Sequence, residues 1–328
     1  MNLVERAVSQ GGKLAPIVIT QTFGGMNASV FIDDDGDVLV NVRVVNYTLV
    51  HSENNQRFPS RWGPLSYLHP EKDQRLVTEN YLCRLNDNLE LINATRIEMM
   101  ELHQPIWEFV GLEDGRLVRW YGDLYLVGVR RDTTNNGEGR MEYSKIDLDK
   151  EAWTAKEIQR TRIDTPFSKP SYCEKNWYPI VDRPHEFVKW TLPTEIVKAD
   201  PITGVCEQLS LRESFVSPKD QRGSSQVISW GNMRISVTHE VDLFKNYLQQ
   251  KDAIYRHRLV VWDDQMNVVG LSEPFSFLDA RVEFCVGAAK QGEDLLLSFG
   301  FQDNAAFVLR VPKLIVEDLI VEALNYAY

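Results

Sequence analysis

The stretch Leu117–Val129 reads LVRWYGDLYLVGV and indicates the fold of this 328-residue chain. It consists of two short runs in which apolar side chains recur, with Gly122-Asp123 between them. Such a dipeptide between two such runs is typical of the tight turn in an antiparallel hairpin. The stretch therefore predicts two paired β-strands.

The hairpin pattern recurs along the chain. The other four predicted hairpins, with their turns, are Val30–Val44 around Asp35-Gly36-Asp37, Ile180–Trp190 around Pro184-His185, Val227–Val237 around Gly231-Asn232 and Gly287–Phe299 around Gly292-Glu293. Their spacing is too irregular for a solenoid of short repeats, whereas one hairpin per unit with further strands between fits a β-propeller. We therefore expect an all-β fold, a five-bladed β-propeller.

Further strand-like runs lie between the hairpins and would complete the blades. They are Tyr81–Leu85, Glu142–Ile146, Leu259–Trp262 and Ala306–Val311. Two segments stay open: Asp242–Lys251 could form a surface helix, and Lys313–Leu324 either a terminal helix or a closing strand. Thr133–Gly139 and Pro166–Pro170 are expected to be loops, and neither separates regions of different composition. Although the length suggests about two domains, we expect residues 1–328 to form one propeller domain.

Composition and charge narrow the class of ligand. The chain has 36 Lys and Arg against 47 Asp and Glu, a net charge of −11, and 43% hydrophobic residues, as in an ordinary globular protein with a packed core. It has no long basic run, which argues against nucleic acid as a partner. We expect a small-molecule ligand instead.

Targeting signals and metal motifs are not evident in the sequence. No apolar stretch approaches the roughly 18 residues of a membrane span, and Glu5 and Arg6 interrupt the region where a signal peptide needs apolar residues. We expect a cytoplasmic protein that does not bind membranes. The four cysteines are widely spaced and the six histidines lack ligand spacing, so we expect reduced thiols and no metal site.

Polar and charged residues flank the predicted hairpins. They are Asn27, Arg43, Glu113-Asp114-Gly115-Arg116, Arg130-Arg131-Asp132, Glu174-Lys175-Asn176, Arg222-Gly223-Ser224, His239-Glu240 and Asp303. Because the ends of inner propeller strands converge on the axis, these residues can meet in one pocket. Carboxylates mixed with cations suit glycosyl chemistry, in which a carboxylic acid protonates the leaving oxygen. Water as nucleophile usually needs a second carboxylate, whereas phosphate needs cations and hydroxyls.

Four of these runs resemble the ordered motifs of glycoside hydrolase family 130. They are Leu112–Arg116, Glu174–Pro179, Val237–His239 and Ser298–Asp303, and the resemblance spans about Asn27 to Asp303. The family comprises five-bladed propellers that act with inversion, and most members are β-mannoside phosphorylases. The resemblance therefore implies a five-bladed propeller and an inverting enzyme. Kinetoplastid-type mannosyltransferase/phosphorylases are related to it.

The resemblance also implies residue roles for the sugar side of a site. Asp114 matches the catalytic acid, which in the family relays its proton through a sugar hydroxyl. Arg116 would hold the sugar or orient Asp114. Asn27 and Arg43 match residues that bind the mannosyl unit, and Asp303 matches a carboxylate that binds its hydroxyls.

The same resemblance implies a phosphate side. Lys175, His239 and Tyr255 fall where the family places phosphate ligands, and Arg140 is matched to a phosphate-binding arginine. This cationic set favours phosphate or a phosphorylated sugar as a reactant, with inorganic phosphate as co-substrate and no cofactor. Although the whole chain is acidic, a cleft can still focus a local positive field.

Two departures indicate a divergent member. Gly115 replaces the proline of the family's Glu-Asp-Pro-Arg motif, which loosens the backbone beside Asp114. Asn176 replaces the aspartate that usually follows the family's lysine, which removes a negative charge beside the expected anion site.

Each candidate residue also has a structural alternative. Asp114 could close a turn, Lys175 could be a solvated loop residue, and His239 could be a hydrogen-bonded structural histidine. Glu283 is a reserve candidate for a water-activating carboxylate, while Glu113 is expected to orient rather than react. Aromatic residues that could stack on sugars, although most belong in the core, are Trp62, Trp107, Trp120, Trp177 and Trp190.

The leading hypothesis is an inverting glycoside phosphorylase that acts on β-mannosides or related glycosides and forms a sugar 1-phosphate reversibly. One alternative is a glycosyltransferase of the same fold that builds a polysaccharide from a nucleotide sugar or sugar phosphate. Another is a non-catalytic, glycan-binding propeller. The sequence leaves open the sugar, the linkage, a homo-oligomeric state, and which of Arg130, Arg131 and Arg140 reaches the pocket.

Overall fold

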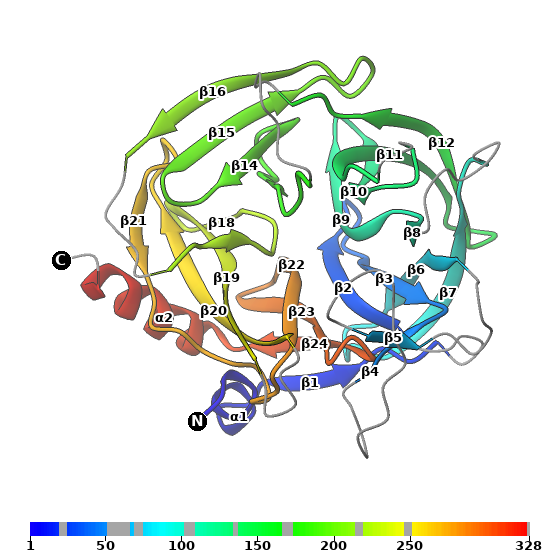
Figure 1. The fold of residues 1–328 in the computed structure, drawn as a ribbon. Coiled ribbons are helices and arrows are strands. Elements are labelled where there is room, and N and C mark those ends of the chain that lie inside the picture. The colour runs from blue at the N-terminus through cyan, green and yellow to red at the C-terminus, as the bar shows by residue number, and fades with distance from the viewer. Residues whose placement is uncertain are drawn as a thin grey trace.

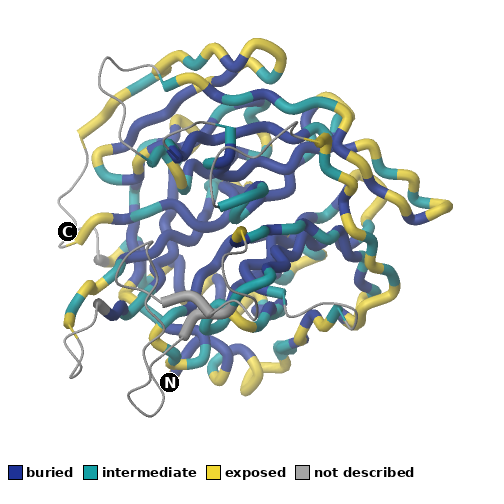
Figure 2. Tube along the Cα trace, turned by 45° about the vertical axis from the view of Figure 1, so that its right-hand side comes forward, coloured by how far each residue is buried: buried dark blue, intermediate teal, exposed yellow. Residues whose placement is uncertain are grey.

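The protein is built almost entirely from β-strands, which confirms the all-β prediction. A computed structural model describes residues 1–19, 25–50, 66–68, 75–101, 109–133, 137–165, 173–213, 219–245 and 251–326. The sheets follow one another in chain order around a common centre (Figure 1). The inner strands are buried and the exposed residues gather toward the periphery (Figure 2).

The largest sheet has nine strands and contains the first two predicted hairpins. Its strands are β2 (Gly25–Ile32), β3 (Val38–Val45), β6 (Leu76–Leu85), β7 (Leu91–Glu98), β8 (Phe109–Val110), β9 (Glu113–Trp120), β10 (Asp123–Arg130), β11 (Arg140–Asp149) and β12 (Thr154–Arg162). The pairs β2–β3 and β9–β10 confirm the hairpins. A short parallel pairing of β7 with β12 joins two antiparallel arrays that the sequence analysis expected to be separate blades.

The remaining predicted hairpins lie in three smaller sheets. The third sheet contains β13 (Tyr178–Pro179), β14 (Glu186–Trp190), β15 (Thr194–Ala199) and β16 (Cys206–Arg212). The fourth contains β17 (Arg222–Gly223), β18 (Ile228–Trp230), β19 (Met233–Lys245), β20 (Lys251–Trp262) and β21 (Val268–Leu271). The last contains β1 (Lys13–Pro16), β22 (Glu283–Gln291), β23 (Asp294–Phe301) and β24 (Ala305–Val311). A separate pair consists of β4 (Thr48–Val50) and β5 (Ser66–Leu68).

The two ends of the chain meet in one sheet. β1 pairs antiparallel with β24, from Lys13 opposite Arg310 to Pro16 opposite Phe307. The ring of sheets is therefore closed by hydrogen bonds between the first and last strands of the chain. No sequence pattern in β1 had indicated this pairing.

Two helices complete the fold. Helix α1 (Leu3–Ser9) was not predicted, and Asn2 caps it by accepting a hydrogen bond from the Glu5 amide at 2.9 Å. Of the two alternatives for Lys313–Leu324, the terminal helix is the one that forms, as α2 (Lys313–Tyr326). Its apolar face is buried in the core. The expected surface helix at Asp242–Lys251 is not formed at its described ends, which belong to β19 and β20.

Some predictions fall outside the described residues. They are the loop Pro166–Pro170, the middle of the loop Thr133–Gly139, Trp62 and Trp107. The four cysteines are free thiols, as predicted. Within the described ranges, no set of three His, Cys, Asp or Glu side chains is grouped to hold a metal ion. No helix among these residues has the length and apolar character needed to cross a membrane.

A buried polar network ties the inner strands together below the pocket described next. Gln226 is fully buried and donates to the Leu117 carbonyl at 2.8 Å, while its Oε1 accepts from the Ala288 amide at 2.9 Å. Ser298 Oγ accepts from the Val30 amide at 2.8 Å. Because these partners come from different sheets, the network fixes the strands relative to one another.

Candidate active site

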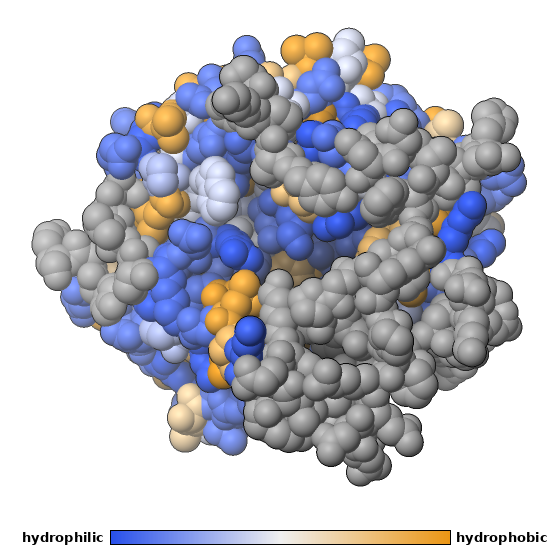
Figure 3. Space-filling model, viewed as in Figure 1, coloured by the Kyte–Doolittle hydropathy of each residue, from blue (hydrophilic) through white to orange (hydrophobic). Residues whose placement is uncertain are grey.

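A polar pocket opens on one face of the ring, where Figure 3 shows the surface hollowed among hydrophilic side chains. Its volume is about 320 Å³. The lining residues are Met26, Asn27, Arg43, Tyr47, Phe109, Glu113, Asp114, Arg131, Lys175, Asn176, Arg222, His239, Tyr255, Val282, Phe284 and Asp303. The structure thus brings together seven predicted site residues, namely Asn27, Arg43, Asp114, Lys175, His239, Tyr255 and Asp303.

Irregularities in two inner strands direct Asn27 and Asp114 into this pocket. In the β2–β3 ladder the register shifts between Met26 and Ser29, and in the β9–β10 ladder it shifts between Val127 and Val129. A bulge of this kind inserts an extra residue and re-aims its side chain. As a result, Asn27 Nδ2 donates to Asp114 Oδ1 at 2.9 Å across 87 positions of sequence.

The Asp114 carboxylate is surrounded by groups that favour its ionised form. Its Oδ1 also accepts from Arg43 Nη1 at 2.9 Å. Burial by itself raises the pKa of Asp114, but Arg43, the Asn27 hydrogen bond, Lys175 and Arg116 together lower it below the usual value. Asp114 is therefore ionised at neutral pH in the ligand-free protein.

Arg43 is the central cation of the sugar side of the pocket. It donates to Tyr47 Oη at 2.7 Å and lies 3.5 Å from Glu113 Oε2. Burial opposes its charge, but Tyr47, Glu113, Asp114 and Asp303 raise its pKa well above the usual value. Glu113 thus holds Arg43 rather than standing alone in the pocket, in agreement with the orienting role expected for it.

Four lining residues have left-handed backbones. The φ angles are 46° for Asn27, 52° for Asp114, 64° for Asn176 and 51° for Asp303. Asn and Asp tolerate this region better than other residues with a side chain, and such conformations concentrate at functional sites. The pocket therefore uses residue types that can supply both the backbone geometry and the polar group.

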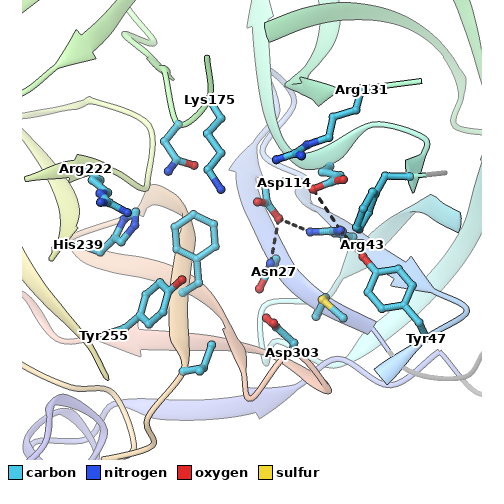
Figure 4. A pocket seen from close by; sticks show the side chains of 16 residues that line it. Asn27, Arg43, Tyr47, Asp114, Arg131, Lys175, Arg222, His239, Tyr255 and Asp303 are labelled. Atoms are coloured by element: carbon cyan, nitrogen blue, oxygen red, sulfur yellow. Dashed lines mark hydrogen bonds and ion pairs between the residues drawn. The ribbon is translucent and has the colours of Figure 1, made fainter. Parts of the chain in front are cut away.

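Lys175 and Arg222 form the cationic side of the pocket. They lie on the side away from Arg43, with His239 and Tyr255 beside them (Figure 4). Among the described residues, no carboxylate comes within 4.0 Å of either side chain as an ion-pair partner. Two pocket-facing cations without carboxylate partners form a site suited to an anion.

His239 adds a neutral imidazole to this side. Burial, reinforced by His257 and by the charges of Arg222 and Lys175, lowers its pKa well below the usual value. Its Nδ1 forms a hydrogen bond with Ser224 Oγ at 2.8 Å. When Ser224 is the donor in this bond, Nε2 carries the proton and can donate to an anion. The ring also stacks on Tyr255, with centroids 5.5 Å apart.

Two cations of the pocket had no assigned role in the sequence analysis. Arg222 had been noted only as a hairpin flank, and Arg131 is the one of the three open arginines that lines the pocket. Arg130 is instead buried beside Asp132 and Glu142, at 3.4 and 3.1 Å. Adjacent residues at a strand end point in different directions, so sequence alone could not choose between Arg130 and Arg131.

Two predicted site residues, Arg140 and Arg116, do not line this pocket. Arg140 is buried at the start of β11, where its guanidinium donates to the Gly139 carbonyl at 2.8 Å and to Glu138 at 3.1 Å. Arg116 is 1% exposed and donates to the Asp114 carbonyl at 3.2 Å and to the Ser224 carbonyl. It holds the backbone beneath Asp114 and is not placed to hold a sugar.

Glu283, the reserve carboxylate, is also outside the pocket lining. It is fully buried, and it accepts hydrogen bonds from the amides of Phe277 and Leu278 at 2.7 Å and of Ala280 at 3.0 Å. Burial raises its pKa although these bonds oppose the shift. Its structural role is to order the backbone before β22.

The glycine that replaces the motif proline is explained by packing. A Cβ on Gly115 would lie 2.7 Å from the side chain of Leu126, which occupies the space above the backbone. The Gly115 carbonyl accepts from Asn41 Nδ2 at 3.2 Å. The backbone next to Asp114 is therefore held by neighbours rather than by a proline ring.

Three of the named tryptophans can be placed. Trp120 and Trp177 belong to the core, at 3% and 1% exposure, whereas Trp190 is 43% exposed. Trp190 does not line the pocket.

Comparison with known proteins supports the fold. No family model and no curated protein matches the chain. Among solved structures, a β-1,2-mannobiose phosphorylase from Listeria innocua is similar with a TM-score of 0.55 at 12% identity, covering 95% of this chain and 94% of that one. A GDP-Man-dependent mannosyltransferase from Leishmania mexicana gives 0.53 at 12% identity, covering 91% and 89%. A glycosyl hydrolase from Bacteroides ovatus gives 0.54 at 11% identity, covering 88% and 84%. These likenesses show that the chain shares its fold with these proteins over most of its length.

Proposed function

We propose that this protein is an inverting, phosphorylase-like enzyme that transfers a mannosyl or related glycosyl unit between phosphate and an acceptor hydroxyl. Inorganic phosphate is the co-substrate and no cofactor is required. The observation that carries the proposal is the division of one pocket into two sides. Asp114 is bound to Arg43 and Asn27, and it faces a side where Lys175 and Arg222 have no carboxylate partner among the residues that the structure describes.

The two sides fit the geometry of an inverting displacement. Nucleophile and leaving group occupy opposite sides of the anomeric carbon in such a reaction. Phosphate at Lys175, Arg222 and His239 would then lie across the sugar from the acceptor oxygen, which meets Asp114. The hydroxyls of the transferred sugar would be held near Asn27 and Asp303.

The ionised state of Asp114 fits the direction that builds a glycoside. In that direction the acceptor oxygen attacks the anomeric carbon, the bond from this carbon to the phosphate oxygen breaks, and the Asp114 carboxylate takes the acceptor's proton. In phosphorolysis the same carboxyl must begin protonated. The negative charge of bound phosphate would raise the pKa of Asp114, because a like charge disfavours the ionised form.

Fold likeness supports this class of reaction without fixing it. Of the similar structures, one is a β-1,2-mannobiose phosphorylase and another a GDP-Man-dependent mannosyltransferase. We further propose that the sheets form one five-bladed propeller domain, with the nine-stranded sheet counted as two blades joined through β7 and β12. We expect the activity in the cytoplasm.

The test is release of phosphate from mannose 1-phosphate in the presence of a panel of sugar acceptors. Asp114→Asn should lower turnover by about 10²- to 10⁴-fold, the usual contribution of a general acid or base. Asp147→Asn is a matched control, because Asp147 is 58% exposed and pairs with Lys156 on the surface. The proposal is contradicted if none of the acceptors supports turnover, or if Asp114→Asn turns over as fast as the wild type.

Two other results would assign the pocket differently. Turnover with nucleotide sugars alone would identify a glycosyltransferase and exclude the phosphorylase. Binding of glycans without any bond formation or cleavage would identify a non-catalytic binding protein.

A further inference from the structure

A second recess adjoins the cationic side of the pocket. Its volume is about 230 Å³. The described residues that line it are Cys173, Glu174, Lys175, Asn176, Trp177, Lys189, Trp190, Arg222 and Gly223. The proposed reaction uses Lys175 and Arg222 but assigns no role to the other residues of this recess.

Trp190 gives the recess an exposed aromatic ring. Trp190 as a residue is 43% exposed, whereas the other tryptophans in the described ranges are at most 9% exposed. Trp177, by contrast, is buried, and its Nε1 donates to Glu174 at 3.3 Å. An exposed indole beside cations is a platform on which a flat ring can stack.

An irregularity in β14 places two neighbouring side chains in the recess. The β14–β15 register shifts between Val188 and Trp190, so that Lys189 and Trp190 both line it, although adjacent strand residues normally face opposite sides. Lys189 lies 3.4 Å from Glu195, and its Nζ is 5.8 Å from the centre of the Trp177 ring. Its charge is therefore balanced locally, which leaves Lys175 and Arg222 as the cations at the junction.

The position of the recess relative to the reaction is informative. It shares Lys175, Asn176 and Arg222 with the main pocket, but it shares none of the sugar-side residues Asn27, Arg43, Asp114 and Asp303. In an inverting reaction the acceptor lies on the opposite side of the sugar from the phosphate. A recess beyond the phosphate ligands is thus placed for a group attached to the phosphate, not for the acceptor.

We propose that this recess binds the nucleoside part of a nucleoside diphosphate, with the base stacked on Trp190 and the phosphates at Lys175 and Arg222. The inference rests on the proposed function for the location of the transferred sugar, and it extends the donor from a sugar 1-phosphate to a nucleotide sugar. The acceptor oxygen bonds to the anomeric carbon as the bond from that carbon to the β-phosphate oxygen breaks. The nucleoside diphosphate leaves with the bonding electrons, and the acceptor's proton passes to Asp114.

The test measures binding, so it does not depend on turnover. Isothermal titration with ADP, GDP, UDP, CDP and inorganic phosphate should show that at least one nucleoside diphosphate binds the wild-type protein at least tenfold more tightly than phosphate. Trp190→Ala should weaken that binding by roughly tenfold or more, as expected for loss of one base–aromatic stack. Phosphate binding should be unchanged, and Trp190→Phe should keep most of the affinity because it retains a ring.

Tyr121→Ala is the matched control, since Tyr121 is an aromatic residue that is 83% exposed and lines neither the pocket nor the recess. The inference is overturned if no nucleoside diphosphate binds more tightly than phosphate, or if Tyr121→Ala causes the same loss. It is also overturned if Trp190→Ala weakens binding of a mannobiose acceptor but not of nucleotides. Nucleotide binding without any glycosyl transfer would support the nucleotide site and contradict the proposed function. Phosphate-dependent transfer without nucleotide binding would support the proposed function and contradict the nucleotide site.

Discussion

Asn27 Nδ2 donates to Asp114 Oδ1 at 2.9 Å, and both residues have left-handed backbones, with φ angles of 46° and 52°. The bond joins β2 and β9, at the points where the pairing of each strand with its neighbour shifts in register. The same carboxylate oxygen accepts from Arg43 at 2.9 Å. The ionised form of Asp114 is therefore stabilised by Asn27 and Arg43, which lie on β2 and β3, far from the Asp114 motif in sequence.

Removing the Asn27 amide should shift the pH dependence of glycoside synthesis. Asn27→Gly deletes the hydrogen bond while tolerating the positive φ, so the lowered pKa of Asp114 should rise toward its usual value. Synthesis needs ionised Asp114, which is lost as pH falls through this pKa. The acidic limb of the pH–rate profile should move to higher pH, and Asn88→Gly, a change at an exposed turn residue, should leave it in place.

Asn27→Ala is expected to be less stable than Asn27→Gly. Both variants lose the hydrogen bond, but alanine is strained at this φ by roughly 1–2 kcal/mol. Comparing the free energies of unfolding of the two variants in urea isolates the backbone contribution. Equal stability would show that the left-handed conformation relaxes.

Replacing Lys175 or Arg222, the cations shared by the pocket and the recess, should weaken the binding of phosphate rather than the binding of sugar. Lys175→Met or Arg222→Met should each raise the KM for phosphate by about tenfold or more, since a hydrogen bond to a charged group contributes about 1.5–3 kcal/mol. The KM for the glycoside should change little. Lys219→Met removes a surface lysine that pairs with Asp242 at 2.6 Å and serves as the control. A parallel rise in both KM values would contradict the division of the pocket.

Arg131 and Arg140 should behave differently on substitution. Arg131 lines the pocket, so Arg131→Met should reduce turnover or raise a KM at least severalfold. Arg140 is buried, does not line the pocket and is bonded to Gly139 and Glu138, so Arg140→Met should lower the melting temperature and leave the kinetics of the folded fraction unchanged. Steady-state kinetics with thermal unfolding of both variants decides this. Loss of phosphate affinity in Arg140→Met alone would restore the role that the family resemblance implied.

Glu283→Gln should act on stability and not on chemistry. The carboxylate orders three backbone amides, and the amide side chain can accept fewer of these bonds, which should cost about 1–3 kcal/mol. The rate per folded molecule should equal that of the wild type. A folded Glu283→Gln protein with impaired turnover would instead support the catalytic role first considered for it.

The three described histidines should make stability depend on pH. Burial lowers the pKa of His185, His239 and His257, the last to about 3. The unfolded chain therefore binds more protons than the folded protein once pH falls below the usual histidine value of about 6.5. The free energy of unfolding should decrease between pH 6.5 and 5, by up to about 1.4 kcal/mol per pH unit for each histidine. Urea titrations across this range measure the slope, and a flat dependence would contradict it.

Local patterning alone determined the five hairpins, because alternation of apolar residues around a short turn encodes pairing between neighbouring segments. The sequences of β1 and β24 carry no comparable signal for their pairing, because strands at opposite ends of a chain are not joined by a turn that would mark them as partners. The short parallel link between β7 and β12 was missed for the same reason. Helix α1 was missed because seven residues hold too little periodicity to stand out.

For the site, the family resemblance of the sequence motifs pointed to Asp114, Lys175 and His239, and all three line the pocket. Only the tertiary structure decided that Arg131 and Arg222 line the pocket while Arg140 and Arg116 are buried outside its lining. The physical reason is that a one-residue shift in a strand turns a side chain to the opposite face. The bulges that make these shifts depend on neighbouring strands, so chemistry could be predicted from residue types, but direction required the folded chain.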